Sequence, residues 1–250
     1  MLEYNLRMDT SKKPYALGAI ILSAGFILST LIGAYTFLKV RSLDDVLTVT
    51  GSARMEVVAD KVKWVTVINR PTTPRTLKAG YEQMANDLAL VKKFYTDNGI
   101  DEKMLSISPV FMDEVYSNYM TTGADKQYNL RQTFMIDSTD VNGVTKLTKN
   151  TGSLIASGVV FSTQTLEYSY SKLADLRVSM LKDAVTDAKA RANELVNGTG
   201  KSVGKLKSAS SGVVQVQAKG SNEVSDYGSY DMSTIDKSIM VTVKVTFALN

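Results

Sequence analysis

The chain contains no cysteine and no histidine among its 250 residues. Without cysteine it can form no disulfide, no thiol nucleophile and no lipid attachment through a cysteine. Without histidine, Ser-His-Asp and Cys-His arrangements and histidine metal sites are impossible, and the usual proton shuttle at neutral pH is missing. We therefore expect no catalytic residues, no metal site and no cofactor.

Most of the chain also has almost no excess of one charge sign, although the formal net charge is +4. Residues 1–41 contain five basic and two acidic side chains, whereas the rest contains 24 basic and 23 acidic ones. A nucleic-acid-binding protein needs a basic face that replaces condensed counterions. The balance predicts no nucleic-acid partner, and 44% apolar residues with only 4 prolines are typical of a folded protein.

Residues 15–38 form the one long apolar run, YALGAIILSAGFILSTLIGAYTFL, which has no charged side chain. A helix of about 24 residues is about 36 Å long, enough for a hydrocarbon core of about 30 Å. We predict a cytoplasmic tail over 1–14, a transmembrane anchor over 15–38, a linker over 39–45 and an extracytoplasmic domain over 46–250. The competing interpretation is a cleaved signal, but its apolar region would be shorter and followed by a small-x-small site.

Gly25, Ser29 and Gly33 recur every four residues in this apolar run. Such a ridge of small residues lets two membrane helices approach closely. Small residues are also common in membrane helices in general, so the ridge is a candidate packing surface for self-association and no more.

The segment after residue 45 alternates between strand and helix patterns. β-Branched runs predict strands, and apolar residues at steps of three or four predict helices. Ala59-Asp60-Lys61, between the first two strands, indicates a hairpin or a sharp bend. Strands are expected over 46–58, 62–68, 104–112, 128–136, 159–170 and 238–249, a strand or a pair of strands over 203–217, and helices over 74–98, 140–158 and 172–196.

This order is not a strict alternation of strand and helix. It predicts an α+β fold with a mixed or antiparallel sheet and about three packed helices rather than a doubly wound parallel sheet.

Several local patterns occur in an order that resembles the SIMPL domain family, also called YggE-like. They are Gly51 in the first strand, Asn98-Gly99-Ile100 after the long helix, Ser106-Ile107-Ser108-Pro109, Ala156-Ser157-Gly158-Val159, the helix segment 181–192 (LKDAVTDAKARA), and Gly200 with Val203-Gly204-Lys205-Leu206. The chain departs from the family pattern at two turns, where Ala59 replaces a proline and Ala53 replaces a glycine. Both departures concern local geometry.

The resemblance implies an α+β domain that is secreted or anchored in the bacterial envelope. It also implies ring-like oligomers, an association with envelope stress and no agreed catalytic activity, so it provides no active-site residues.

Two motifs resemble functional sites, but each lacks a feature that the site requires. Gly200-Lys201-Ser202 resembles the end of a phosphate loop, but Leu195 stands where that motif requires glycine. Asp226, Asp231 and Asp236 could supply oxygen ligands for Ca²⁺ or Mg²⁺, yet the spacing of a calcium loop is absent.

Four tyrosines lie in two polar loops: Tyr116, Tyr119, Tyr227 and Tyr230. Tyrosine supplies large contact area, so these are candidate interface residues, although they could equally pack against their own loops.

These observations favour a membrane-anchored interaction protein of the bacterial inner membrane, with the bulk of the chain in the periplasm. We expect the protein either to form a homo-oligomer, for which a ring is one form, or to dock on an envelope protein. The alternatives are a carboxylate-based ligand-binding or hydrolytic domain, and a channel-like ring of subunits.

Overall fold

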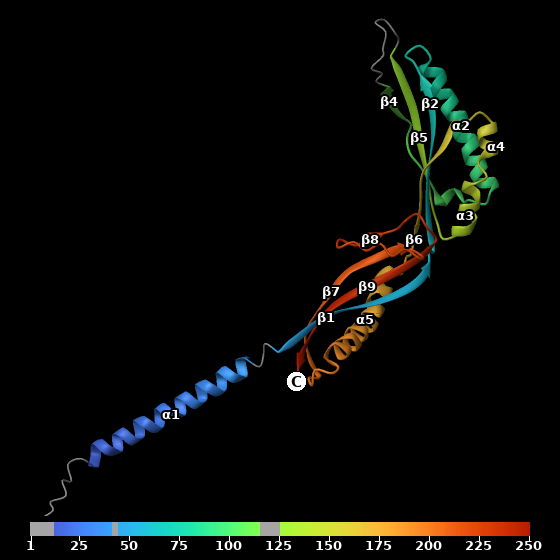
Figure 1. Ribbon diagram of the computed structural model, residues 1–250. Coiled ribbons are helices and arrows are strands. Elements are labelled where there is room, and N and C mark those ends of the chain that lie inside the picture. Colours follow the sequence, from blue (N-terminus) through green and yellow to red (C-terminus); the bar gives the residue numbers. More distant parts are fainter. Residues whose placement is uncertain (1–12, 42–44, 116–125) are drawn as a thin grey trace, which may run out of the picture. The chain divides into compact units, whose positions relative to one another are not determined.

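The structure, a computed structural model, describes residues 13–41, 45–115 and 126–250 (Figure 1). Its elements in chain order are α1 (Lys13–Arg41), β1 (Val46–Val58), β2 (Lys61–Thr72), α2 (Leu77–Asp97), the 3₁₀ turn η3 (Glu102–Met104), β3 (Leu105–Ile107), β4 (Phe111–Val115), β5 (Gln127–Ser138), α3 (Val141–Thr148), α4 (Gly152–Ala156), β6 (Phe161–Ser169), α5 (Leu173–Val196), β7 (Val203–Ala218), β8 (Ser229–Tyr230) and β9 (Asp236–Leu249).

The chain divides into two compact units, each described by itself. Unit 1 comprises residues 1–51, 186–210 and 244–250, and unit 2 comprises residues 52–185 and 211–243.

Helix α1 includes a segment that is long and apolar enough to cross a membrane. This segment, Leu17–Val40, has 24 residues and a mean hydropathy of 2.1, and none of it is buried in the structure. Its hydroxyls bond back to the helix, Ser23 to the carbonyl of Ala19 at 2.7 Å and Thr30 to that of Phe26 at 2.8 Å. Internal bonding of this kind suits a helix that lies in lipid, and a signal sequence near the N-terminus has the same composition.

The other part of unit 1 joins the beginning of β1 to the end of β9 and the beginning of β7. The N–H of Leu249 donates to the carbonyl of Asp45 at 2.9 Å, and Ser202 and Asn250 exchange two backbone hydrogen bonds of 3.0 Å. The Nζ of Lys201 lies 3.3 Å from a carboxylate oxygen of Asp45. These contacts tie the first residues of the folded domain to its last ones.

Unit 2 contains a five-stranded sheet in which β2 and β5 are the inner strands. The order is β3-β5-β2-β6, β4 also pairs with β5, and each of these pairs is antiparallel. Helices α2, α3 and α4 lie on one side of this sheet (Figure 1). Alternate residues of β2, namely Val62, Trp64, Thr66 and Ile68, are fully buried.

An aromatic cluster fills the centre of this core. The ring of Trp64 meets the rings of Tyr95 and Phe161 edge-on, with centroids 5.6 and 6.1 Å apart. Phe94 and Phe134 contact Tyr95 from either side, with centroids 5.5 and 6.3 Å away. Edge-to-face pairs of this kind add to the free energy gained by burying the rings.

The second sheet has the order β1-β9-β7-β8. Its β7 and β8 strands are parallel, so the protein contains both antiparallel and parallel pairs, as the mixed sheet predicted from the sequence requires. Within unit 2, α5 packs on this sheet where Met180 meets Val216, Ile239 and Val241.

Two local predictions were wrong. The strand expected over 104–112 is a 3₁₀ turn followed by β3 and β4, because Pro109 interrupts the pairing with β5. The helix expected over 140–158 is two helices, with a break before Gly152, a residue of low helix propensity. Of the two alternatives predicted at Ala59-Asp60-Lys61, the hairpin is excluded, because β1 and β2 belong to different sheets.

One helix end differs in detail from the predictions, and another agrees. Helix α2 begins at Leu77 rather than at Pro74, which lies in the preceding turn. Helix α3 begins after Asp140, the first residue of the helix expected over 140–158, and the Asp140 carboxylate accepts from the N–H of Gly143 at 2.8 Å.

Candidate functional site: the open edge of β7

Among the described residues, strand β7 lies beside β9 and pairs on its other side with β8, at Gln215 and Val216. Its residues from Lys205 to Val213 are exposed, on both faces of the strand, whereas Gln215, Val216 and Gln217 are buried. We refer to residues 205–210, which lie in unit 1, as the open edge. An edge strand presents unpaired N–H and C=O groups and is a template for pairing with another strand.

The side chains of the open edge divide it into two parts. Lys205 and Lys207 carry charges, and lysine on an edge strand discourages pairing with a second chain. Ser208, Ala209 and Ser210 are small and uncharged, so they impose no steric or electrostatic barrier to an approaching strand. The open edge can therefore accept a partner strand along its second half.

The segment that follows β7 is held against the sheet by a buried glutamine. The amide nitrogen of Gln215 donates to the carbonyl of Ser225 at 2.5 Å, and its oxygen accepts from the Ser229 hydroxyl at 2.8 Å. Gln215 is 1% exposed. It therefore fixes the turn that carries Tyr227 and Tyr230.

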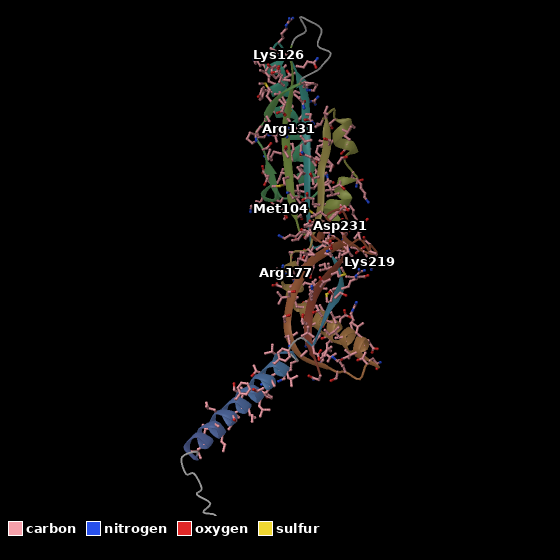
Figure 2. The ribbon with its side chains drawn as sticks, turned by 60° about the vertical axis from the view of Figure 1, so that its left-hand side comes forward. Met104, Lys126, Arg131, Arg177, Lys219 and Asp231 are labelled. Atoms are coloured by element: carbon pink, nitrogen blue, oxygen red, sulfur yellow. The ribbon has the colours of Figure 1, made fainter. Side chains whose placement is uncertain are left out.

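A buried ion pair closes the same segment. Lys237, 0% exposed, donates from Nζ to the carbonyl of Asp231 at 2.6 Å and lies 3.3 Å from its carboxylate. Burial would raise the pKa of Asp231, but the hydroxyls of Thr234 and Ser233 and the charge of Lys237 lower it more, so the pKa lies well below its ordinary range. Figure 2 shows where Asp231 lies on this segment.

The tyrosines named from the sequence fall in different places. Tyr227 is 96% exposed and Tyr230 45% exposed, so both are available for contact with another molecule. Tyr116 and Tyr119 lie outside the described residues. The structure does not test whether any of the four binds a partner.

The small-residue ridge on α1 is accessible in the single chain. A Cβ atom added at Gly25 or Gly33 would meet no heavy atom within 4 Å. At the far end of the helix the Nζ of Lys39 lies 5.8 Å from the ring centroid of Tyr35. Whether Gly25, Ser29 and Gly33 pack against a second helix is a prediction that a single chain leaves open.

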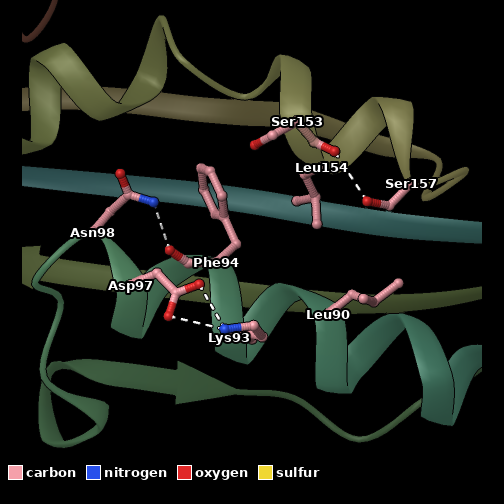
Figure 3. Close-up of a pocket in the computed structure, with 8 residues that line it drawn as sticks. All are labelled: Leu90, Lys93, Phe94, Asp97, Asn98, Ser153, Leu154 and Ser157. Atoms are coloured by element: carbon pink, nitrogen blue, oxygen red, sulfur yellow. Dashed lines mark hydrogen bonds and ion pairs between the residues drawn. The ribbon is translucent and has the colours of Figure 1, made fainter.

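A hollow of about 200 Å³ lies between α2 and α4 (Figure 3). The amide of Asn98 donates to the carbonyl of Phe94 at 2.7 Å, and Lys93 pairs with Asp97 at 2.9 Å. The charged side chains that line this hollow therefore already have partners on α2.

Three carboxylates on β4 and α5 pair with nearby basic side chains. Asp113 pairs with Arg131 on β5 (Figure 2) and Glu114 with Lys126, at 3.2 and 3.0 Å. Asp187 pairs with Arg191 four residues later, at 2.8 Å. Among the described residues no three acidic side chains form a group that could hold a metal ion, and this includes Asp226, Asp231 and Asp236.

Sequence reasoning missed an ion pair of unit 2 whose carboxylate is fully buried. Arg70 on β2 forms two hydrogen bonds with Asp87 on α2, of 2.6 and 2.8 Å, and a third with the carbonyl of Gly158 at 2.7 Å. The bond with Asp87 raises the pKa of Arg70. A polar residue at an apolar position of the α2 pattern was the available signal, since a buried Asp requires a partner.

Two further polar side chains are buried beside the loop that follows β7. Gln217 and Ser238 are each 3% exposed, and within the described part of the chain neither side chain has a hydrogen-bond partner. The N–H of Lys219 donates to the carbonyl of Asp236 at 3.0 Å, so Gln217 and Ser238, each two positions further into its strand, lie about opposite each other. Burying the polar groups of Gln217 and Ser238 without partners costs folding free energy.

The fold and its surfaces define a class of protein: an α+β domain with two sheets and an open strand edge, preceded by one exposed apolar helix. The family described as SIMPL, protein of unknown function (DUF541), matches residues 47–247. The chain belongs to the SIMPL family. No curated protein matches the chain.

Proposed function

We propose that this protein is a non-catalytic interaction protein of the bacterial envelope. Helix α1 anchors it in the inner membrane, and the domain on the extracytoplasmic side assembles with further copies of itself. The open edge of β7 is the observation that carries the proposal, because it supplies a built surface for strand pairing.

Pairing between β7 of one copy and β1 of the next would use both free edges of the same sheet. Strand β1 is an outer strand in the order β1-β9-β7-β8, and Met55 near its end is 42% exposed. A head-to-tail contact of this kind repeats from copy to copy and closes into a ring when the rotation permits. Confinement to one membrane raises the effective concentration of the copies.

The absence of native cysteine makes the contact testable by crosslinking. Full-length chain carrying Ala209→Cys and Met55→Cys is reconstituted in vesicles and oxidised. We expect covalent dimers and higher ladders from the double variant and little from either single variant.

A size-matched control carries Ala89→Cys with Met55→Cys, since Ala89 is exposed on α2, away from the strand edges. Equal crosslinking in both double variants would indicate random collision and would contradict edge pairing. A chain that alkaline carbonate releases from membranes would contradict the anchor instead.

A further inference from the structure

We infer that the end of the domain nearest α1 forms a contact surface for anionic lipid headgroups, made by Lys201, Lys205 and Lys207. The inference rests on the proposed anchoring of α1. It concerns the binding of lipid by charged side chains near the bilayer, whereas self-assembly depends on strand pairing between copies.

The covalent chain limits how far this surface can lie from the membrane. Four peptide units separate Arg41, the last residue of α1, from Asp45, and four residues reach at most about 14 Å. Lys201 lies 3.3 Å from the Asp45 carboxylate. Because the headgroup layer of each leaflet adds about 5–8 Å beyond the hydrocarbon core, Lys201 is held close to the headgroups.

Lys205 and Lys207 follow on the same strand, within about 20 Å of Lys201 along an extended chain. Their side chains are exposed and, two residues apart on a strand, point to the same face. Lys201 itself is 47% exposed although it pairs with Asp45. Three exposed cationic groups thus lie within a short length of chain that begins near the anchor.

The distribution of charge matches an anionic partner. From Lys39 onward, unit 1 contains eight basic and four acidic side chains, whereas unit 2 contains eighteen basic and nineteen acidic ones. The positive excess of the chain from Lys39 onward therefore belongs to the unit that includes the anchor. Basic residues beside a membrane helix bind anionic lipid and are released as salt screens them.

The test uses full-length chain in nanodiscs that hold one copy each. A fluorophore on Ser202→Cys reports contact with a headgroup-attached quencher, in discs of phosphatidylcholine alone or mixed with phosphatidylglycerol. We expect quenching to rise roughly twofold with phosphatidylglycerol. It should fall again when ionic strength goes from about 0.15 M to about 1 M, because the Debye length shrinks from about 8 Å to about 3 Å.

Two triple variants with the same change in net charge locate the effect. Lys201→Gln, Lys205→Gln and Lys207→Gln together should abolish the rise, whereas Lys78→Gln, Lys103→Gln and Lys149→Gln in unit 2 should leave it intact. A fluorophore on Ala89→Cys should show no dependence on lipid charge.

Quenching that ignores phosphatidylglycerol, or an equal loss in both triple variants, would overturn the inference while leaving the anchor standing. A chain that fails to enter the discs, seen as separate peaks on gel filtration, would overturn the anchor and the inference together. Intact crosslinking through Ala209→Cys in discs with several copies distinguishes a failure of lipid contact from a failure of self-assembly.

Discussion

Strands β2 and β7 are both long, yet one is the centre of a core and the other is largely surface. Strand β2 is paired along both sides, by β5 and β6, and its Val62, Trp64, Thr66 and Ile68 are fully buried. Strand β7 is exposed from Lys205 to Val213 and is buried only near its end. Along β2 the backbone hydrogen-bonding groups are used by neighbouring strands on both sides. Where a strand has one neighbour, as β7 has over its first part, the backbone groups on its other side can pair with a partner strand.

The buried polar groups also differ in whether they have hydrogen-bond partners. Two buried polar groups beside β2 have partners: Asp87 is held by Arg70, and Thr66 by Tyr95, whose hydroxyl oxygens lie 2.7 Å apart. The buried side-chain oxygen of Gln132, opposite Ile68, has no partner among the described residues. Beside the end of β7, Gln217 and Ser238 have no partner within the described residues. The following predictions test this contrast between satisfied and unsatisfied buried groups.

Replacing Asp87 by alanine should have the largest effect. It leaves the Arg70 guanidinium, 21% exposed, without its carboxylate, and breaking a buried pair in this way costs about 3 kcal/mol of unfolding free energy. Chemical denaturation monitored by the fluorescence of Trp64, the single tryptophan, measures the change. Asp97→Ala, which breaks the exposed pair with Lys93, is the control and should cost under about 0.5 kcal/mol.

Asp231→Asn should cost about 2 kcal/mol at neutral pH, because hydrogen bonds to a charged acceptor are lost. The folded protein holds the pKa of Asp231 below its unfolded value of about 3.9. That contribution is therefore present above about pH 4 and is lost as pH falls further. Denaturation between pH 7 and pH 3 should show a steeper loss of stability in the native chain than in the variant; parallel curves would refute the assignment.

Tyr95→Phe should cost about 1 kcal/mol, because it leaves the buried hydroxyl of Thr66 without a partner. The double variant Tyr95→Phe with Thr66→Val removes both polar groups and should recover most of that loss. A double-mutant cycle on the unfolding free energy measures the sign of the interaction energy between Tyr95 and Thr66. Additive effects of the two substitutions would exclude that interaction.

Ser238→Ala should be neutral or stabilising by up to about 1 kcal/mol, since it removes a buried hydroxyl that has no partner. The same change at Thr66, where the hydroxyl is bonded, should destabilise, which makes Thr66→Ala the matched comparison. A clear loss of stability in Ser238→Ala would show that an ordered water satisfies this group.

Ala209→Glu on the open edge should have the smallest effect on stability, within about 0.5 kcal/mol, because the residue is exposed. It should nevertheless reduce self-association, since a charge on an edge strand opposes pairing. Native mass spectrometry in detergent measures the oligomer distribution of the variant and of the native chain. An unchanged oligomer distribution would place assembly elsewhere, for instance on the Gly25, Ser29 and Gly33 ridge.

Much of the architecture could be predicted from local patterns. The strand over 46–58 and the helix ends near residues 97 and 196 follow from β-branched runs, apolar periodicity and glycine stops. The patterns were wrong or left two alternatives where a local signal competes with tertiary pairing. Pro109 divides one expected strand into β3 and β4, and Ala59-Asp60 carries the chain from one sheet to another instead of closing a hairpin.

The candidate site was less accessible to sequence reasoning. The exposed tyrosines Tyr227 and Tyr230 could be named from loop composition alone. The open edge could not, because Lys205–Ser210 has no pattern that distinguishes an outer strand from an inner one until its neighbours are known. The partner of Asp87 was equally hidden, since Arg70 lies 17 residues away on another element.

Composition and periodicity alone determined that the chain has a long apolar N-terminal segment, a near-neutral α+β domain and neither thiol nor imidazole chemistry. These properties depend on which residues are present and how they repeat locally, so the linear sequence contains them. Tertiary structure decided which strand is central and which is an edge, and which buried polar groups find partners. Those outcomes depend on contacts between residues far apart in the chain, which no local pattern specifies.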